Sequence, residues 1–119
     1  MRDETQPKWA SALAADRLRA DFLFGLVALD TGIHAVEIQS ERRSPTATRA
    51  RQIAIYLAHV GFGWPLHRVA CAFARDRSTV SHACHIVEDM REDRAFDARL
   101  NALEGCLKAA PATPAPLPA

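Results

Sequence analysis

The sequence predicts an all-α domain of five or six short helices that contains a helix-turn-helix unit. Leu66, Val69 and Phe73 recur at the spacing of a short amphipathic helix. A polar turn over residues 74–77 then leads into a second apolar stripe, which consists of Val80, Ala83, Val87 and Met90. No segment shows the alternation of a strand, and 49% of the 119 residues are hydrophobic, which is enough for one modest core.

The pattern of residues in the N-terminal part of the chain predicts one long helix followed by one short helix. After a polar stretch at residues 1–8, apolar residues keep helical spacing over Trp9–Leu29. Gly25 weakens this helix and is expected to mark a break or a close helix contact. Gly32 suits a left-handed C-cap, and the short helix is expected at Ala35–Gln39.

The segment before the helix-turn-helix unit predicts a loop, a helix and a turn. Residues 40–48 form a basic loop, in which Pro45 is expected to prevent helix formation. Thr48 then caps a helix over Arg49–His59, and residues 61–65 form a turn.

The remaining residues complete the expected domain organisation. A last helix is expected at Asp97–Leu107, and the Ala/Pro-rich tail at residues 108–119 is expected to be disordered. Residues 1–19 form a partly helical N-terminal extension, and residues 20–107 form the helix-turn-helix domain.

Positive charge is concentrated in the middle of the chain. The net charge is only +1, yet residues 42–85 contain seven arginines and a single acidic residue, Asp76. The segments on either side are net acidic. A contiguous basic block is the electrostatic footprint of a protein that binds a polyanion, although a solvated charged face has the same composition.

The sequence predicts no metal, cofactor or membrane span. The three cysteines lack CxxC spacing, and Cys71 and Cys84 are expected to pack as small apolar residues within helices. His82 and His85 near Cys84 match no zinc spacing. The polar N-terminus is not a signal peptide and Phe22–Leu29 is too short to span a bilayer, so we expect a cytoplasmic protein.

The second helix of the predicted unit has a polar face suited to DNA. This face carries only short hydroxyl and imidazole side chains, namely Ser78, Ser81, His82 and His85. Such side chains can approach base edges or phosphates closely, and Arg77 can reach a guanine or a phosphate. Asp76 is the expected N-cap and can also accept a hydrogen bond from a cytosine amino group. The alternative is a capped surface helix that faces water.

A group of arginines precedes this unit and consists of Arg42, Arg43, Arg49 and Arg51. An arginine on an arm beside a major-groove helix commonly enters the adjacent minor groove. Arg51 and Gln52 are expected to open a helix, where backbone N–H groups and side chains hold a phosphate. The alternative is a solvated linker.

Two segments together resemble the C-terminal DNA-binding domain of the bacterial replication initiator DnaA. Residues 49–58 read R-A-R-Q-I-A-I-Y-L-A, and residues 72–84 read A-F-A-R-D-R-S-T-V-S-H-A-C. The family shows R-P-R-Q-x-A and F-G-x-R-D-H-[ST]-T-V-x-H-A. The resemblance covers about residues 20–107 and implies the family's helix-turn-helix fold, which is similar to that of Trp repressor.

The resemblance implies a role for each matching residue. Arg43 would reach the minor groove, and Arg51 and Gln52 would contact phosphate. Asp76, Arg77, Ser78 and Thr79 would read bases and backbone in the major groove, with His82 close behind. The complete set expected at DNA is Arg42, Arg43, Arg49, Arg51, Gln52, His59, Leu66, His67, Arg68, Asp76, Arg77, Ser78, Thr79, Ser81 and His82.

The chain departs from the family pattern at positions that bear on specificity. Arg77 stands where the family has His, and His59 stands where a basic residue is frequent. The usual Leu-Pro-Glu opening of the first motif helix is replaced by Leu66-His67-Arg68, and Pro45 interrupts the basic loop. We therefore expect the binding mode to be kept and the choice of DNA site to differ from the initiator's usual box.

DNA binding is the predicted activity, and catalysis is not. The glycines do not form the G-x-x-x-x-G-K-[ST] loop that cradles ATP phosphates, and Asp76 with His82 or His85 offers no nucleophile. One expected function is a transcription regulator, and another is a replication modulator that competes with DnaA for its boxes. A third is a protein-interaction adaptor that has lost DNA binding, which the retained Arg43, Arg51, Ser78 and Thr79 argue against.

A regulator of this size is expected to need a protein partner to activate transcription. Activators of gene transfer agents carry a domain similar to this one, joined to or working with a sigma-factor-like part. The leading specific expectation is therefore an activator subunit whose partner is a sigma-factor-like activator or RNA polymerase. The helix near Trp9–Arg19 is the expected docking element, and the alternative is that it packs on its own domain.

Overall fold

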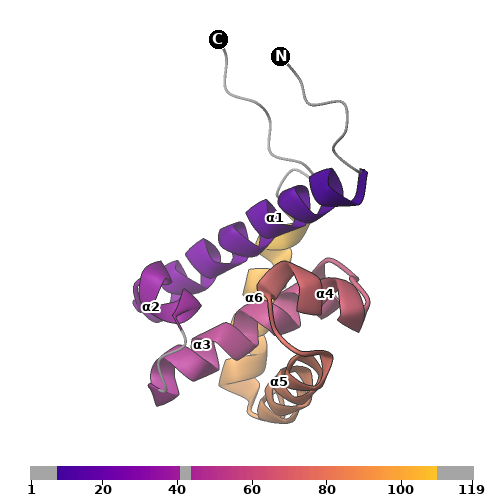
Figure 1. Cartoon of the computed structure of the whole chain (residues 1–119). Helices are drawn as coiled ribbons and strands as arrows, with labels where there is room; N and C mark the ends of the chain where they lie inside the picture. The colour runs from indigo at the N-terminus through magenta and orange to yellow at the C-terminus, as the bar shows by residue number, and fades with distance from the viewer. Residues whose placement is uncertain (1–7, 41–43, 110–119) are drawn as a thin grey trace.

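The computed structural model describes residues 8–40 and 44–109, which form an all-α fold (Figure 1). The predicted all-α class is confirmed, and no strand occurs within these ranges. α4 and α5 are the two helices of the predicted helix-turn-helix unit. In chain order the elements are α1 (Lys8–Thr31), α2 (Ala35–Gln39), α3 (Pro45–Tyr56), the π-helical turn η1 (Leu57–Gly61), α4 (Leu66–Phe73), α5 (Arg77–Met90) and α6 (Arg94–Ala109).

α1 is one continuous helix, and it runs without interruption through the expected boundary after residue 19. The expectation for Gly25 was wrong, because α1 does not break there and a Cβ at this position would meet no atom within 4 Å. The helix buries Ala20, Leu23 and Val27. It ends before Gly32, which has the positive φ of +76° expected of a left-handed cap.

α3 begins four residues earlier than the sequence predicts, so the loop before it is shorter. Pro45 is the first helical residue, and Ser44 rather than Thr48 is the N-cap. The Ser44 hydroxyl accepts a hydrogen bond from the backbone N–H of Ala47 at 3.4 Å. Proline suits the first helical position because its missing N–H would have no partner there. The expected start at Arg49 therefore lies within the helix.

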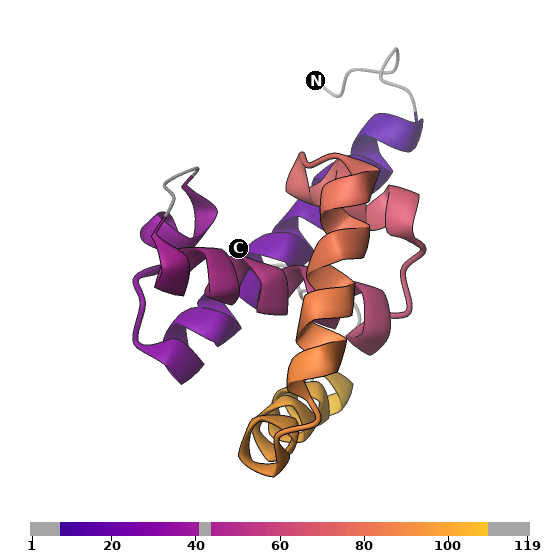
Figure 2. The same cartoon turned by 90° about the horizontal axis from the view of Figure 1, so that it is seen from below.

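α3 lies at the centre of the fold (Figures 1 and 2). Ile53, Ala54, Tyr56 and the adjoining Leu57 of η1 are at most 2% exposed. α5 packs against α3, while α1 contacts both α3 and α4. The buried face of α5 consists of the predicted core residues Val80, Ala83 and Val87. The helix-turn-helix unit, α4 and α5, is thus packed on the core, with one side of α5 left exposed.

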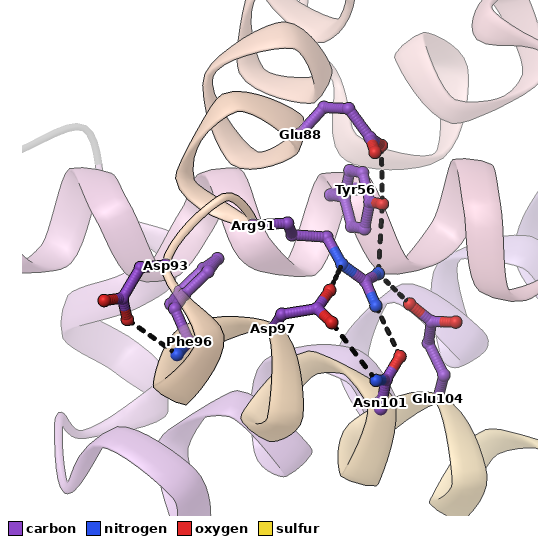
Figure 3. Close-up of polar contacts among 8 residues, drawn as sticks. All are labelled: Tyr56, Glu88, Arg91, Asp93, Phe96, Asp97, Asn101 and Glu104. Carbon is purple, nitrogen blue, oxygen red and sulfur yellow. Dashed lines mark hydrogen bonds and ion pairs between the residues drawn. The ribbon is translucent and has the colours of Figure 1, made fainter.

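A polar cluster joins the end of α5 to α3 and α6 (Figure 3). Arg91 donates from Nε to Asp97 at 2.6 Å, and from Nη1 to Glu104 and to the Tyr56 hydroxyl, the latter at 3.1 Å. The Tyr56 hydroxyl in turn donates to Glu88 at 2.7 Å. Burial lowers the pKa of Arg91, but its hydrogen bonds outweigh burial and raise that pKa above the usual value. Arg91 therefore stays charged and bridges the three helices.

α6 begins at Arg94, earlier than the predicted Asp97. The reason is a cap at Asp93, whose carboxylate accepts a hydrogen bond from the backbone N–H of Phe96 at 2.9 Å. The helix extends to Ala109, so the first two residues of the expected disordered tail are helical. Residues 110–119 lie outside the described residues, as do residues 1–7.

The cysteines only partly follow the expectation. Cys71 is exposed, because Val69 and Ala72 supply the buried face of α4 and Cys71 points away from them. Cys84 is half-buried, and burial raises the pKa of its thiol to about 11. Within the described ranges, no helix has the length and apolar character needed to cross a bilayer.

Candidate nucleic-acid interface

The turn between α4 and α5 is tight and strained at one residue. Ala74 has a φ of +53°, in the left-handed region that non-glycine residues rarely adopt. The turn is closed by the Arg75 N–H, which donates to the carbonyl of Ala70 at 3.0 Å. Asp76 occupies the N-cap position of α5, as predicted, but its side chain makes no capping hydrogen bond. Its exposed carboxylate is therefore left in front of the helix.

The start of α5 presents a polar surface. The side chains of Arg77, Ser78, Thr79 and His82 are exposed, and Ser81 is half-buried. Among the described residues, Arg77 has no hydrogen-bond or ion-pair partner. Because the opposite face of α5 is buried in the core, these side chains project from a helix that packing holds in place. That arrangement is the one in which a helix-turn-helix places its second helix in the major groove.

The α3 residues of the predicted set lie in the second turn of that helix, not at its start. Backbone N–H groups at Arg51 and Gln52 are consequently internal, so the expected helix-terminus phosphate site is not formed there. Arg49 Nη1 donates to the Gln52 side chain at 3.0 Å. Arg51 donates to the backbone carbonyls of Ser40 at 2.7 Å and Ile38 at 3.3 Å, and so fixes the end of α2 against α3.

Arg42 and Arg43, the expected minor-groove arm, lie outside the described residues. The described residues on either side of residues 41–43 are Ser40, which follows α2, and Ser44, which caps α3. The minor-groove role of this arm stays a prediction.

Two residues that are predicted to contact DNA, Arg68 and His59, contact other residues of this chain near α4. The Arg68 guanidinium donates to both oxygens of Asp16 in α1, at 2.8 and 2.9 Å, and lies 4.3 Å from the ring centre of Trp64. The hydrogen bond with Asp16 raises the pKa of Arg68. His59 Nδ1 lies 2.7 Å from the Trp64 carbonyl oxygen. These two side chains position α4, whereas His67 at its start is exposed.

Asp16 is the structurally important residue that sequence reasoning missed. It is 8% exposed and is the one buried charged residue among those described. Its partner lies 52 residues further along the chain, so neither spacing nor periodicity could link them. The available signal was an acidic residue on the same side of α1 as the buried Ala20, Leu23 and Val27.

Comparison with known proteins identifies the family. The family model described as "Bacterial dnaA protein helix-turn-helix" matches residues 21–87, more than half of the chain. The chain belongs to this family. The DnaA-like helix-turn-helix is a DNA-binding domain, which agrees with the exposed polar start of α5.

A solved structure is similar to this chain as well. It is the crystal structure of a DNA replication initiation factor, with 28% sequence identity and a TM-score of 0.71. The match covers 83% of this chain but 31% of that protein, so the present chain corresponds to under a third of the initiation factor. The DnaA-like fold extends beyond the family-matched segment, since 83% of the chain superimposes.

Proposed function

We propose that this chain is a sequence-specific regulator of transcription that binds double-stranded DNA through α5 and activates transcription with a protein partner. The observation that carries the proposal is the exposed start of α5, where Arg77, Ser78, Thr79 and His82 project from a helix whose other face is buried. Arginine can bind guanine through two hydrogen bonds, and short hydroxyls allow the helix to enter the major groove deeply.

Selection from a random duplex library tests sequence-specific binding. The protein is expected to enrich a defined motif, and Arg77→Ala is expected to weaken binding to that motif by about 5- to 150-fold, the equivalent of about 1–3 kcal/mol. Arg94→Ala is the matched control, because Arg94 is also an exposed arginine at the first position of a helix. Enrichment of no motif by the folded protein would contradict sequence-specific recognition.

The outer face of α1 supports the proposal of a protein partner. Leu18, Phe22 and Leu29 lie along one side of this helix and are 59%, 44% and 86% exposed, and Trp9 near its start is 69% exposed. A helix that only faces water does not usually expose apolar residues of this size together. The proposed partner is a sigma-factor-like activator or RNA polymerase, and the regulated genes include those of a gene transfer agent.

A second candidate is a replication modulator that competes with DnaA for its boxes. The family membership favours it, whereas Arg77 in place of the family His favours a different site. Substituting Arg77→His is expected to move the selected motif toward the initiator box. An unchanged motif would show that Arg77 contacts phosphate only.

Genome-wide occupancy separates the two functions. A tagged protein is mapped with and without expression of its chromosomal neighbours. Peaks at a few promoters that depend on a neighbouring gene support the partner-dependent activator. Peaks at the origin and at initiator boxes support the replication modulator, and the absence of any peak contradicts both.

A further inference from the structure

An apolar stripe runs along the outer side of α1. Ala15, Leu18, Phe22, Gly25 and Leu29 follow one another at alternating steps of three and four residues, which places them on one face of the helix. This face lies opposite the buried face of α1, which packs against α3 and α4 (Figure 1). Leu18, Phe22 and Leu29 are exposed along the stripe. The spacing is that of the seam between two helices of a coiled coil.

Gly25 leaves a hollow in the middle of this stripe. A Cβ at this position would meet no atom within 4 Å. Large side chains stand on either side of it, Phe22 before and Leu29 after. Because glycine has no side chain, a bulky group from a second helix can approach the backbone closely there.

The order of residues in the stripe fits a second copy of the same helix in antiparallel orientation. When two copies of α1 are paired about the point midway between Phe22 and Gly25, Phe22 of each copy faces Gly25 of the other. Leu18 of each copy then faces Leu29 of the other. Parallel pairing would set Phe22 against Phe22 and Gly25 against Gly25, which crowds one layer and leaves the next one empty. The stripe is therefore complementary to itself in the antiparallel orientation.

The charged residues beside the stripe are compatible with this pairing. Arg19 and Asp21 lie on its two sides. In the antiparallel pair they face Leu26 and Ala28 of the other copy, so no like charges are opposed.

We propose that α1 binds α1 of a second copy of this chain in antiparallel orientation through the stripe. The contact is isologous, because a two-fold axis places the same surface on both sides. The inference goes beyond the proposed function, from which it takes only DNA binding by α5. Because the contact is one helix wide, we expect an exchanging dimer in the micromolar range rather than an obligate one. The protein partner in the proposed function would use the same face, so the partner and a second copy exclude each other there.

The dimer would turn its two DNA-binding surfaces away from each other. α3 lies between α1 and α5, and the buried face of α5 packs against α3 (Figures 1 and 2). The exposed polar face of α5 therefore points away from α1, and a two-fold axis at α1 sends the two α5 helices to opposite ends of the dimer. Such a dimer holds two separate DNA segments together, rather than two half-sites one helical turn apart.

Sedimentation of the full chain over a range of concentrations tests the dimer. Leu18→Ala is expected to raise its dissociation constant by about 100-fold or more, because symmetry removes the leucine from both sides of the contact. Val60→Ala is the matched control, since Val60 is an exposed apolar residue outside α1 and should leave the dissociation constant unchanged. A wild-type protein that stays monomeric at millimolar concentration overturns the proposal.

A swap of the two facing residues tests the pairing itself. Phe22→Gly and Gly25→Phe are each expected to weaken the dimer, the second even though it adds apolar surface. The double variant, which carries both changes, should recover the wild-type dissociation constant to within several-fold, because phenylalanine again faces glycine. Stronger association of Gly25→Phe alone, or no recovery in the double variant, overturns the antiparallel pairing.

Retention of a second duplex tests the arrangement of the DNA-binding surfaces. One selected duplex is immobilised, and a labelled copy of it is added with the protein. The wild-type dimer should retain the labelled duplex, whereas Leu18→Ala should bind the immobilised duplex without retaining the second one. A dimer that binds DNA but never retains a second duplex contradicts the proposed arrangement. Failure to bind any duplex would instead contradict the proposed function, because sedimentation measures the dimer without DNA.

Discussion

Arg68 and Asp16 form a two-point ion pair that fastens α4, the first helix of the helix-turn-helix unit, to α1, with N–O distances of 2.8 and 2.9 Å. The two side chains are unequally covered, since the Asp16 side chain is 11% exposed and that of Arg68 is 41% exposed. Arg68 also lies against the ring of Trp64. The pair therefore anchors α4 through charge and packing together.

We expect Arg68→Ala to lower the free energy of unfolding by about 1–3 kcal/mol, because it leaves the Asp16 carboxylate buried without its partner. Asp16→Ala should cost less, since the more exposed Arg68 can regain water. Urea denaturation of both single variants and the double variant measures the coupling. The control is Arg99→Ala, which breaks the more exposed pair with Asp30 and is expected to cost less than about 1 kcal/mol. Equal losses in both pairs would contradict an anchoring role.

Gly25→Ala should stabilise the protein by about 0.5–1 kcal/mol. Gly25 lies inside the continuous helix α1, and a Cβ there meets no atom within 4 Å. Alanine thus lowers the entropy of the unfolded chain without creating a clash. Gly32→Ala is the opposite control, because its φ of +76° makes any side chain unfavourable and the variant should be less stable. Thermal or urea unfolding measures whether Gly25→Ala raises the stability and Gly32→Ala lowers it.

Ala74→Gly should also raise stability, by about 0.5–1 kcal/mol. The left-handed φ of +53° at Ala74 is unfavourable for alanine, and this cost exceeds the entropy that glycine adds to the unfolded chain. Because Ala74 is in the turn and its change leaves the side chains of α5 in place, DNA affinity should be unchanged. A loss of DNA affinity in a more stable variant would show that DNA binding requires the strained conformation of this turn.

The only tyrosine should titrate far above its ordinary pKa. Burial, followed by the hydrogen bond to Glu88, raises the pKa of Tyr56 to about 12 from 10.0. Below pH 10 the hydroxyl is protonated in both states and its stabilisation is complete. As pH rises toward 12 the unfolded chain ionises first, so stability falls over that window.

Tyrosinate absorbance measures this pKa directly, because the chain has one tyrosine. The native protein is titrated beside the protein in concentrated urea. Glu88→Gln should lower the native pKa toward 10, because it removes a negative charge that holds the proton. A native titration curve that coincides with the curve in urea would mean that the cluster around Arg91 does not hold the hydroxyl.

The sequence was sufficient for the helix-turn-helix because its periodicity is local. Val69, Val80, Ala83 and Val87 are all buried as the spacing predicts, and Asp76 precedes α5 as expected. The predicted start of α3 at Arg49 is wrong because Pro45 does not break the helix, since proline is favoured at the first helical position. The contacts of Arg68 with Asp16 and of His59 with Trp64 could not be predicted from spacing, because they depend on how the helices pack.

The structure places the limits of the family-matched segment inside helices, since residue 21 lies within α1 and residue 87 within α5. Asp16, which is bonded to α4, and Arg91, which joins the end of α5 to α6, both fall outside that segment. The family-matched segment is therefore smaller than the part of the chain that packs into one fold. Substitutions outside the family-matched segment can therefore change the stability of the helix-turn-helix unit while the exposed side chains at the start of α5 stay the same.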